Sequence, residues 1–330
     1  MARSNGYALD DSGWWQAADG ESREWCTMRF FLAIDAGGTK TECWLADEER
    51  VLARVTGETV KLMNVGEDVA TARLRDLLHQ ASASAGVSLA NVTRSCVGMA
   101  GISSEGVRVW AEAALSTMVA GELVLTGDDE IALHAAFHEG PGVLVIAGTG
   151  SRVLGRCSNG MRVQAGGWGP MLGDEGSGQW IGVEAIRSAL RARDRGLPST
   201  LFKEISGVWE ARSVGALIAR ANQQPRPDFA GLAETVAGCA TRGDALAISV
   251  LERAGEELAA QVGVVFSKML AAGCAGGETR RVAFAGSVLG RSAMVLTAMT
   301  AALKRVHPAT EVDTEPVLPI EGALARARRG

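Results

Sequence analysis

Residues 31–45, FLAIDAGGTKTECWL, predict a β-hairpin with an acid at the end of its first strand. An apolar run ends at Asp35, two glycines and two threonines form the turn, and an alternating run leaves it. Glycine amides and threonine hydroxyls can face phosphate oxygens, and a carboxylate can hold a divalent cation directly or through water. The stretch therefore favours a Mg²⁺-nucleotide site with Asp35 as the metal ligand, although it also suits an ordinary hairpin turn.

A second stretch repeats this pattern further along the chain. Residues 142–155 read GVLVIAGTGSRVLG, which is again a buried strand, a Gly/Thr turn and an outgoing strand. The two hairpins are separated by roughly the length of one lobe. Two phosphate-binding hairpins predict two similar lobes that hold the phosphates of one nucleotide between them.

Length and composition limit the classes of protein. A chain of 330 residues favours two domains, and 47% apolar with 22% charged residues is ordinary for a globular protein. A net charge of −5 and the lack of a long Lys/Arg run argue against a nucleic-acid partner. No apolar run reaches roughly 18 residues, so no membrane span or membrane partner is expected.

The six cysteines are scattered, and no C-x-x-C motif occurs. This usage favours buried, reduced thiols and a cytoplasmic location. The positions are Cys26, Cys43, Cys96, Cys157, Cys239 and Cys274.

Hydrophobic periodicity predicts an α/β protein with mixed sheets and flanking helices. Residues 1–28 show no period and no secretory pattern, which predicts a disordered extension. Strands are expected at 29–35, 41–46, 51–56, 92–99, 123–125 and 282–285, and helices at 67–85, 104–118, 179–193, 244–272 and from 128 and 319. The predicted N-terminal lobe is 29–135 plus 319–330, and the predicted C-terminal lobe is 136–318.

Four segments occur in a fixed order: DAGGTKTE (35–42), AGTGS (147–151), GGWGPMLGDEGS (166–177) and AGSV (285–288). In this order they resemble the N-acetylglucosamine kinase branch of the BadF/BadG/BcrA/BcrD ATPase family, which belongs to the actin-like, sugar-kinase and heat-shock-protein ATPase superfamily. The resemblance covers about residues 29–330, and the third segment is its most specific part. It implies a two-lobed actin-like ATPase fold, with a ribonuclease-H-like mixed sheet and flanking helices in each lobe and the nucleotide in the interlobe cleft.

The resemblance also implies roles for individual residues, with ATP and Mg²⁺ as cofactors. The implied nucleotide contacts are Asp35 (also the metal ligand), Gly37, Gly38, Thr39, Lys40, Gly148, Thr149, Gly150 and Ser151, with Gly286 and Ser287 at the adenosine. The implied sugar contacts are Asn64, Asp128, Thr149, Gly167 and Asp174. Asp128 matches the catalytic aspartate of the family.

Asp128 stands at the start of a predicted helix, where the helix dipole favours a carboxylate. It can therefore be a simple N-cap, or it can accept the proton of a sugar hydroxyl. A weak base suffices, because phosphoryl transfer depends mostly on positioning and charge stabilisation. Asp129 follows directly, so either acid can be the base. Asp174 and Ser177 also suit the cap of the next helix.

The implied activity is ATP-dependent phosphorylation of the 6-hydroxyl of N-acetylglucosamine by a homodimer. Glucosamine and N-acetylmuramic acid are alternative substrates, and Glu175 or Asp129 could meet the ammonium of glucosamine. The other branch of the family suggests an iron–sulfur ATPase activator of a dehydratase, and a catalytically silent sugar sensor is a third alternative. A Rossmann enzyme and a P-loop enzyme are disfavoured, because neither glycine motif is present.

Overall fold

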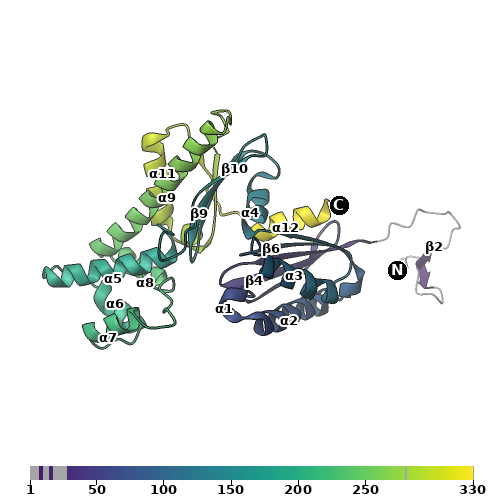
Figure 1. The fold of residues 1–330 in the computed structure, drawn as a ribbon, viewed down its shortest axis with the longest axis horizontal. Coiled ribbons are helices and arrows are strands. Elements are labelled where there is room, and N and C mark those ends of the chain that lie inside the picture. The colour runs from purple at the N-terminus through teal and green to yellow at the C-terminus, as the bar shows by residue number, and fades with distance from the viewer. Residues whose placement is uncertain (1–6, 10–14, 18–27, 279–280, 330) are drawn as a thin grey trace, which may run out of the picture.

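The computed structural model describes residues 7–9, 15–17, 28–278 and 281–329, in which two lobes are each built on a five-stranded mixed sheet (Figure 1). The strand orders are β5-β4-β3-β6-β7 and β10-β9-β8-β11-β12. In chain order within each lobe, both sheets therefore run third, second, first, fourth, fifth. The predicted architecture of two mixed sheets with flanking helices is confirmed, and the two lobes share one topology.

The first sheet starts from the hairpin of residues 31–45. Its strands are β3 (Phe30–Ala36), β4 (Lys40–Ala46), β5 (Val51–Glu58), β6 (Val92–Met99) and β7 (Glu122–Thr126). β3 pairs antiparallel with β4 and parallel with β6, so it is the central strand. One face packs on α2 (Glu67–Ala85) and α3 (Glu105–Met118), whose buried leucines and alanines recur at helical spacing.

The second sheet consists of β8 (Gly142–Ala147), β9 (Ser151–Arg156), β10 (Arg162–Gly166), β11 (Arg281–Ala285) and β12 (Glu311–Val312). Its outer face carries the larger core of the protein. The other helices of this lobe are α5 (Gly178–Asp194), α6 (Leu201–Val208), α7 (Val214–Ala221), α8 (Leu232–Thr241), α9 (Ala245–Ala271), α10 (Ser287–Arg291) and α11 (Ala293–Val306). The long α9 packs on both α11 and the sheet.

The helix α4 (Asp128–Phe137) lies between the sheets, and the terminal α12 (Pro319–Arg328) packs beside it on the first sheet (Figure 1). On α4, Ile131 packs with the first sheet and Leu133 packs with the second. α12 packs on α4, β3 and β6. The two helices approach so closely that a Cβ at Gly322 would overlap the Ile131 carbonyl oxygen. The start of α4 is thus held against both lobes.

Sequence periodicity missed the shortest elements. Residues 60–66, which include α1 (Leu62–Val65), were expected to be an irregular link. β10 was not expected, although its last two residues fall in the predicted glycine-rich loop, and β12 was not expected either. The helix expected from Ser287 to Val306 is divided in two at Ser292, whose hydroxyl accepts a hydrogen bond from Val295 N and caps α11. Elements of two to five residues are too short to show a period, and pairing with a neighbouring strand decides whether they form.

The N-terminal prediction falls mainly outside the described residues. Within the described part, β1 (Tyr7–Leu9) and β2 (Trp15–Ala17) pair antiparallel with each other. Residues 1–6, 10–14 and 18–27 of the predicted extension lie outside the described residues.

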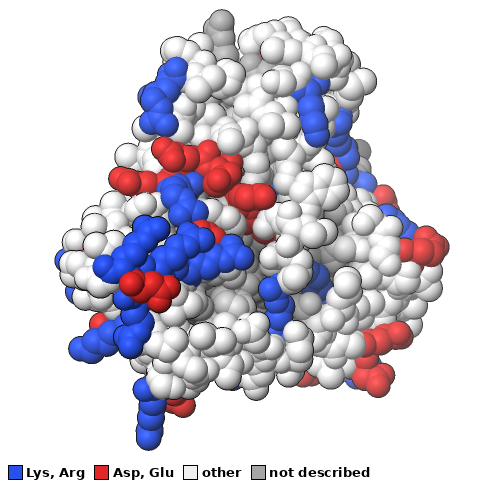
Figure 2. Space-filling view, turned by 60° about the vertical axis from the view of Figure 1, so that its left-hand side comes forward, with Lys and Arg blue, Asp and Glu red and all other residues white. Residues whose placement is uncertain are grey.

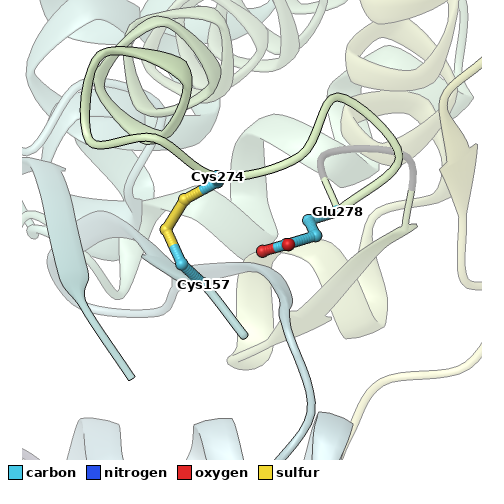
Figure 3. A group of neighbouring side chains, drawn as sticks. All are labelled: Cys157, Cys274 and Glu278. Atoms are coloured by element: carbon cyan, nitrogen blue, oxygen red, sulfur yellow. A yellow bond between two sulfur atoms is a disulfide. The ribbon is translucent and has the colours of Figure 1, made fainter. Parts of the chain in front are cut away.

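One prediction about the cysteines is wrong. Cys157 and Cys274 form a disulfide across a sequence separation of 117 residues, joining the end of β9 to the turn after α9 (Figure 3). Glu278 lies beside them, and its carboxylate accepts hydrogen bonds from Ser158 N and Oγ at 2.9 and 2.8 Å. The free cysteines among the described residues are Cys43, Cys96 and Cys239, and all three are buried. Spacing along the chain could not reveal the pair, because tertiary packing brings the two residues together.

Charged side chains of both signs lie next to one another on the surface. Figure 2 shows a group of acidic side chains directly beside a group of basic ones on the face in view. None of the helices in the described part of the chain combines the length and apolar character needed to cross a bilayer.

Acid stability should depend on His134, which is only 1% exposed on α4. Burial, together with the Arg329 guanidinium, lowers the pKa of His134 from 6.5 to about 4. Between these values the unfolded chain binds a proton that the folded chain does not, so the free energy of unfolding should fall as the pH drops from 6.5 to 4. His134→Leu should weaken this pH dependence in urea titrations.

His79→Leu is the control for that experiment, because His79 is exposed on α2. It should leave the pH dependence of the unfolding free energy unchanged. Equal pH dependence in wild type and His134→Leu would show that His134 does not resist protonation in the fold.

Candidate functional site

The turn of the first hairpin follows β3, and residues outside the hairpin donate hydrogen bonds to its backbone. Gly37 N donates to Lys40 O at 3.1 Å, and Thr59 Oγ1 donates to Gly37 O at 2.9 Å. Asn64, on α1, donates from Nδ2 to Gly38 O at 3.3 Å. Thr39 at the tip is exposed, so the turn presents its threonine hydroxyl to solvent.

Asp35 lies directly before this turn and is opposite Glu42 in the β3–β4 register. Burial, then the Asp128 carboxylate, then Glu42 raise the pKa of Asp35 to about 7, against a smaller opposing effect of Lys40. Lys40 forms an ion pair with Glu42 at the surface. A half-buried carboxylate with acidic neighbours lacks a compensating positive charge, and this donor set fits an oxygen-preferring divalent cation such as Mg²⁺.

The second hairpin is fixed to the N-terminus of α5. Gly178 N donates to Gly148 O at 2.8 Å, and Gln179 N donates to Thr149 O at 3.2 Å. A Cβ at Gly148 would lie 3.9 Å from both N and Oγ of Ser287. The structure therefore brings the second hairpin together with the turn after β11.

Gly286 forms that turn, and its backbone has φ +96°. A Cβ at this position would overlap the Ala147 carbonyl oxygen at the end of β8. Only glycine fits both this conformation and this close approach. The predicted adenosine segment thus lies against the predicted phosphate segment, within one lobe.

The glycine-rich loop is fixed by Asp174, which has φ +60° and is 6% exposed. Its Oδ1 accepts a hydrogen bond from Gly169 N at 3.2 Å, and burial raises its pKa. A Cβ at Gly150 would come within 2.7 Å of Asp174 Oδ2. Asp174 therefore connects this loop to the second hairpin and does not cap α5. Ser177 is the cap, as predicted, because its Oγ accepts from Trp180 N.

The loop also exposes apolar side chains. Trp168, Met171 and Leu172 are 68%, 71% and 83% exposed, so Trp168 is not a core residue. Gly167 has φ +77°, and a Cβ there would lie 3.2 Å from Arg152 Cβ. Gly167 thus packs on the stem of Arg152.

Asp128 is the first residue of α4, as predicted, and its side chain meets an arginine that the sequence did not single out. Arg152 Nη2 donates to Asp128 Oδ1 at 2.7 Å. Arg152 Nη1 lies 3.5 Å from Asp129 Oδ2. Asp128 is also close enough to Asp35 to raise the pKa of that carboxyl. The start of α4 therefore lies between Asp35 of the first hairpin and β9, the strand that leaves the second hairpin.

Arg152 is the residue that sequence reasoning missed. The available signal is its position directly after Ser151, where a charged residue starts the strand leaving the phosphate turn. Glu175, considered for an ammonium group, accepts a hydrogen bond from Gln261 Nε2 at 3.2 Å. Both acids suggested for glucosamine therefore already have partners within the chain.

Comparisons with known proteins show the family and the fold of this chain. The sequence profile of the BadF/BadG/BcrA/BcrD ATPase family matches residues 32–325. A Clostridium acetobutylicum protein named N-acetylmuramic acid/N-acetylglucosamine kinase is 30% identical over 236 residues, covering 70% of this chain and 77% of that protein. An N-acetyl-D-glucosamine kinase of Dictyostelium discoideum is 30% identical over 191 residues, covering 54% and 60%. The structure of a candidate N-acetylglucosamine kinase from Chromobacterium violaceum aligns with TM-score 0.71 and 25% identity, covering 90% of this chain and 98% of that one.

Proposed function

Because this chain belongs to the BadF/BadG/BcrA/BcrD ATPase family, we propose that it is an ATP-dependent kinase that phosphorylates the 6-hydroxyl of N-acetylglucosamine. The observation that carries the proposal is the position of Asp128 at the start of α4, near Asp35 and in contact with Arg152 of β9. This arrangement supports the assignment of Asp128 as the general base and of the two hairpins as the phosphate-binding segments. Two relatives named as kinases of N-acetylglucosamine support the same substrate class.

The proposed reaction needs little covalent chemistry from the protein. Asp128 accepts the proton of the sugar 6-hydroxyl as that oxygen forms a bond to the γ-phosphorus, and the bond from phosphorus to the bridging oxygen breaks to release ADP. Backbone amides of the two hairpins orient the phosphates. Mg²⁺ held at Asp35 would supply charge neutralisation at the β- and γ-phosphate oxygens. Asn64, Gly167 and Asp174 are the proposed sugar contacts.

N-acetylglucosamine is favoured over glucosamine because both candidate acids already have an ion-pair or hydrogen-bond partner. The ammonium of glucosamine needs a free carboxylate, yet Asp129 lies against Arg152 and Glu175 against Gln261. N-acetylmuramic acid remains an alternative because the Clostridium acetobutylicum relative carries it in its name. The homodimer and the cytoplasmic location stay predictions from the sequence.

The iron–sulfur alternative is not favoured by the described cysteines. A cluster shared across a dimer needs accessible thiolates. Cys43, Cys96 and Cys239 are buried, and Cys157 is joined to Cys274.

ADP release should depend on the sugar offered. In a coupled assay with ATP and Mg²⁺, N-acetylglucosamine should stimulate ADP release far more than glucosamine, N-acetylmannosamine, glucose or no sugar, and N-acetylmuramic acid tests the alternative. The 6-deoxy analogue of N-acetylglucosamine should give no phosphorylated product, because it lacks the acceptor oxygen. ADP release that is the same with every sugar and without sugar would contradict the kinase, and iron content would then be measured.

A further inference from the structure

We propose that Arg152 is a positioning residue that makes Asp128, rather than Asp129, the base of the phosphoryl transfer. This inference rests on the proposed function and deepens it, because the sequence leaves the two adjacent acids equivalent. The assignment follows from the partners of the four carboxylate oxygens at the start of α4.

One oxygen of Asp128 is occupied and the other is free for chemistry. Oδ1 accepts hydrogen bonds from Arg152 Nη2 at 2.7 Å and from Asp129 N at 3.0 Å. Among the described residues, no hydrogen bond is made to Oδ2. The side chain of Asp128 is 30% exposed, so it is not closed off from solvent.

Both oxygens of Asp129 have partners. Oδ1 accepts a hydrogen bond from Glu130 N at 3.0 Å, and Oδ2 lies 3.5 Å from Arg152 Nη1. A Cβ at Gly127 would overlap Asp129 Oδ1, so glycine at that position leaves room for the orientation observed. Asp129 is therefore held as a partner of Arg152 through Oδ2, whereas the hydrogen bonds to Asp128 all fall on Oδ1 and leave Oδ2 for a substrate hydroxyl.

Arg152 is well placed to fix this arrangement because its backbone lies inside the second sheet. On β9 it is opposite Ile146 of β8 on one side and Gly166 of β10 on the other. Its stem lies under Gly167, where any Cβ would be 3.2 Å from Arg152 Cβ and 3.6 Å from Cδ. The planar guanidinium then contacts both acids with separate nitrogens. A guanidinium in this position fixes the orientation of a carboxylate and also supplies an opposite charge.

The consequence for the reaction is a defined proton acceptor. With Oδ1 held by Arg152, Asp128 presents Oδ2 to the acceptor hydroxyl, and the proton moves there as the oxygen–phosphorus bond forms. Loss of Arg152 would remove the shorter of the two hydrogen bonds that hold Oδ1, so the carboxylate would be less firmly oriented. The chemical step should suffer more than sugar binding, because misplacing a catalytic group acts on the transition state.

Arg152→Ala tests the proposal by steady-state kinetics with N-acetylglucosamine and ATP–Mg²⁺. We expect kcat to fall by about 10- to 100-fold while the KM for the sugar changes by less than about threefold. Arg152→Lys should recover part of kcat, because it restores the cation without the fork. Free guanidinium, at concentrations well below those that unfold proteins, should also raise kcat of Arg152→Ala.

Arg162→Ala is the matched control. Arg162, on the neighbouring strand β10, forms an ion pair with Glu130, the third acid at the start of the same helix. The variant should keep wild-type kcat and should not respond to guanidinium. If Arg152→Ala does not fold, Arg152→Lys carries the test, with an expected kcat between a few per cent of wild type and wild type.

Three results would overturn the proposal. They are an unchanged kcat in Arg152→Ala, a rise in sugar KM without loss of kcat, and a loss of kcat that neither lysine nor guanidinium restores. The second result would make Arg152 a sugar-binding residue, and a rise confined to N-acetylmuramic acid would assign it to the carboxylate of that sugar. Failure of the proposed function can be told apart from failure of the role given to Arg152, because the wild-type protein itself would then show no sugar-dependent ADP release.

Discussion

Asp128→Asn is expected to lower kcat for N-acetylglucosamine by at least about 100-fold while the KM for the sugar is largely kept. The amide oxygen of asparagine can still accept hydrogen bonds from Arg152 and from Asp129 N, so the start of α4 should keep its geometry. What is lost is the ability to take the proton of the acceptor hydroxyl. Steady-state kinetics and calorimetric titration of the sugar separate these two effects.

Asp129→Asn is the control for this experiment, because it changes the neighbouring acid by the same chemistry. It should reduce kcat by no more than about threefold, since Asp129 contacts Arg152 only at 3.5 Å. An active Asp128→Asn enzyme with an inactive Asp129→Asn enzyme would reverse the assignment and would also remove the basis of the role given to Arg152.

The local parts of this site could be predicted from the sequence because short-range chemistry determines them. The turn after Asp35, the turn after Ala147 and the start of α4 at Asp128 each depend on glycine, threonine or acid residues adjacent in the chain. The helices α4 and α12 were also predicted, from a helix start at Asp128 and a proline at 319. Local signals thus placed the elements that hold the site.

The contacts between distant segments could not be predicted in the same way. Arg152 reaches Asp128 across 24 positions of sequence, and Cys157 meets Cys274 across 117. The first contact arises because α4 packs against both sheets, and the second because α9 packs on the second sheet; no single segment determines either packing. The sequence therefore left Asp128 and Asp129 as equivalent candidates, whereas the oxygen partners in the structure separate them.

Asp35→Asn is expected to abolish activity and to stabilise the fold at the same time. The loss of kcat should be at least about 100-fold, because the proposed ligand for Mg²⁺ at the phosphates is removed. The gain in stability follows from the environment of Asp35, which burial and the Asp128 and Glu42 carboxylates make unfavourable for an ionised acid. Asparagine has nearly the same shape and no charge to bury.

The gain should depend on pH in a defined direction. The pKa of Asp35 is raised from 3.8 to about 7 in the fold, so the folded chain binds a proton between these values that the unfolded chain releases. The contribution of Asp35 to stability therefore declines as the pH rises from 3.8 to about 7, and above that it is at its lowest. Without metal and nucleotide, Asp35→Asn should melt above wild type at pH 8, and the difference should shrink toward pH 5.

Two further measurements make this test decisive. Asp76→Asn changes an exposed acid on α2 and should leave the melting temperature unaltered at both pH values. Adding ATP–Mg²⁺ at pH 8 should raise the melting temperature of wild type more than that of Asp35→Asn. Only wild type has a carboxylate at this position whose unfavourable negative charge the bound cation can compensate. A variant that is inactive yet melts below wild type at pH 8 would mean that Asp35 supports the hairpin itself, and the metal role would have to be assigned elsewhere.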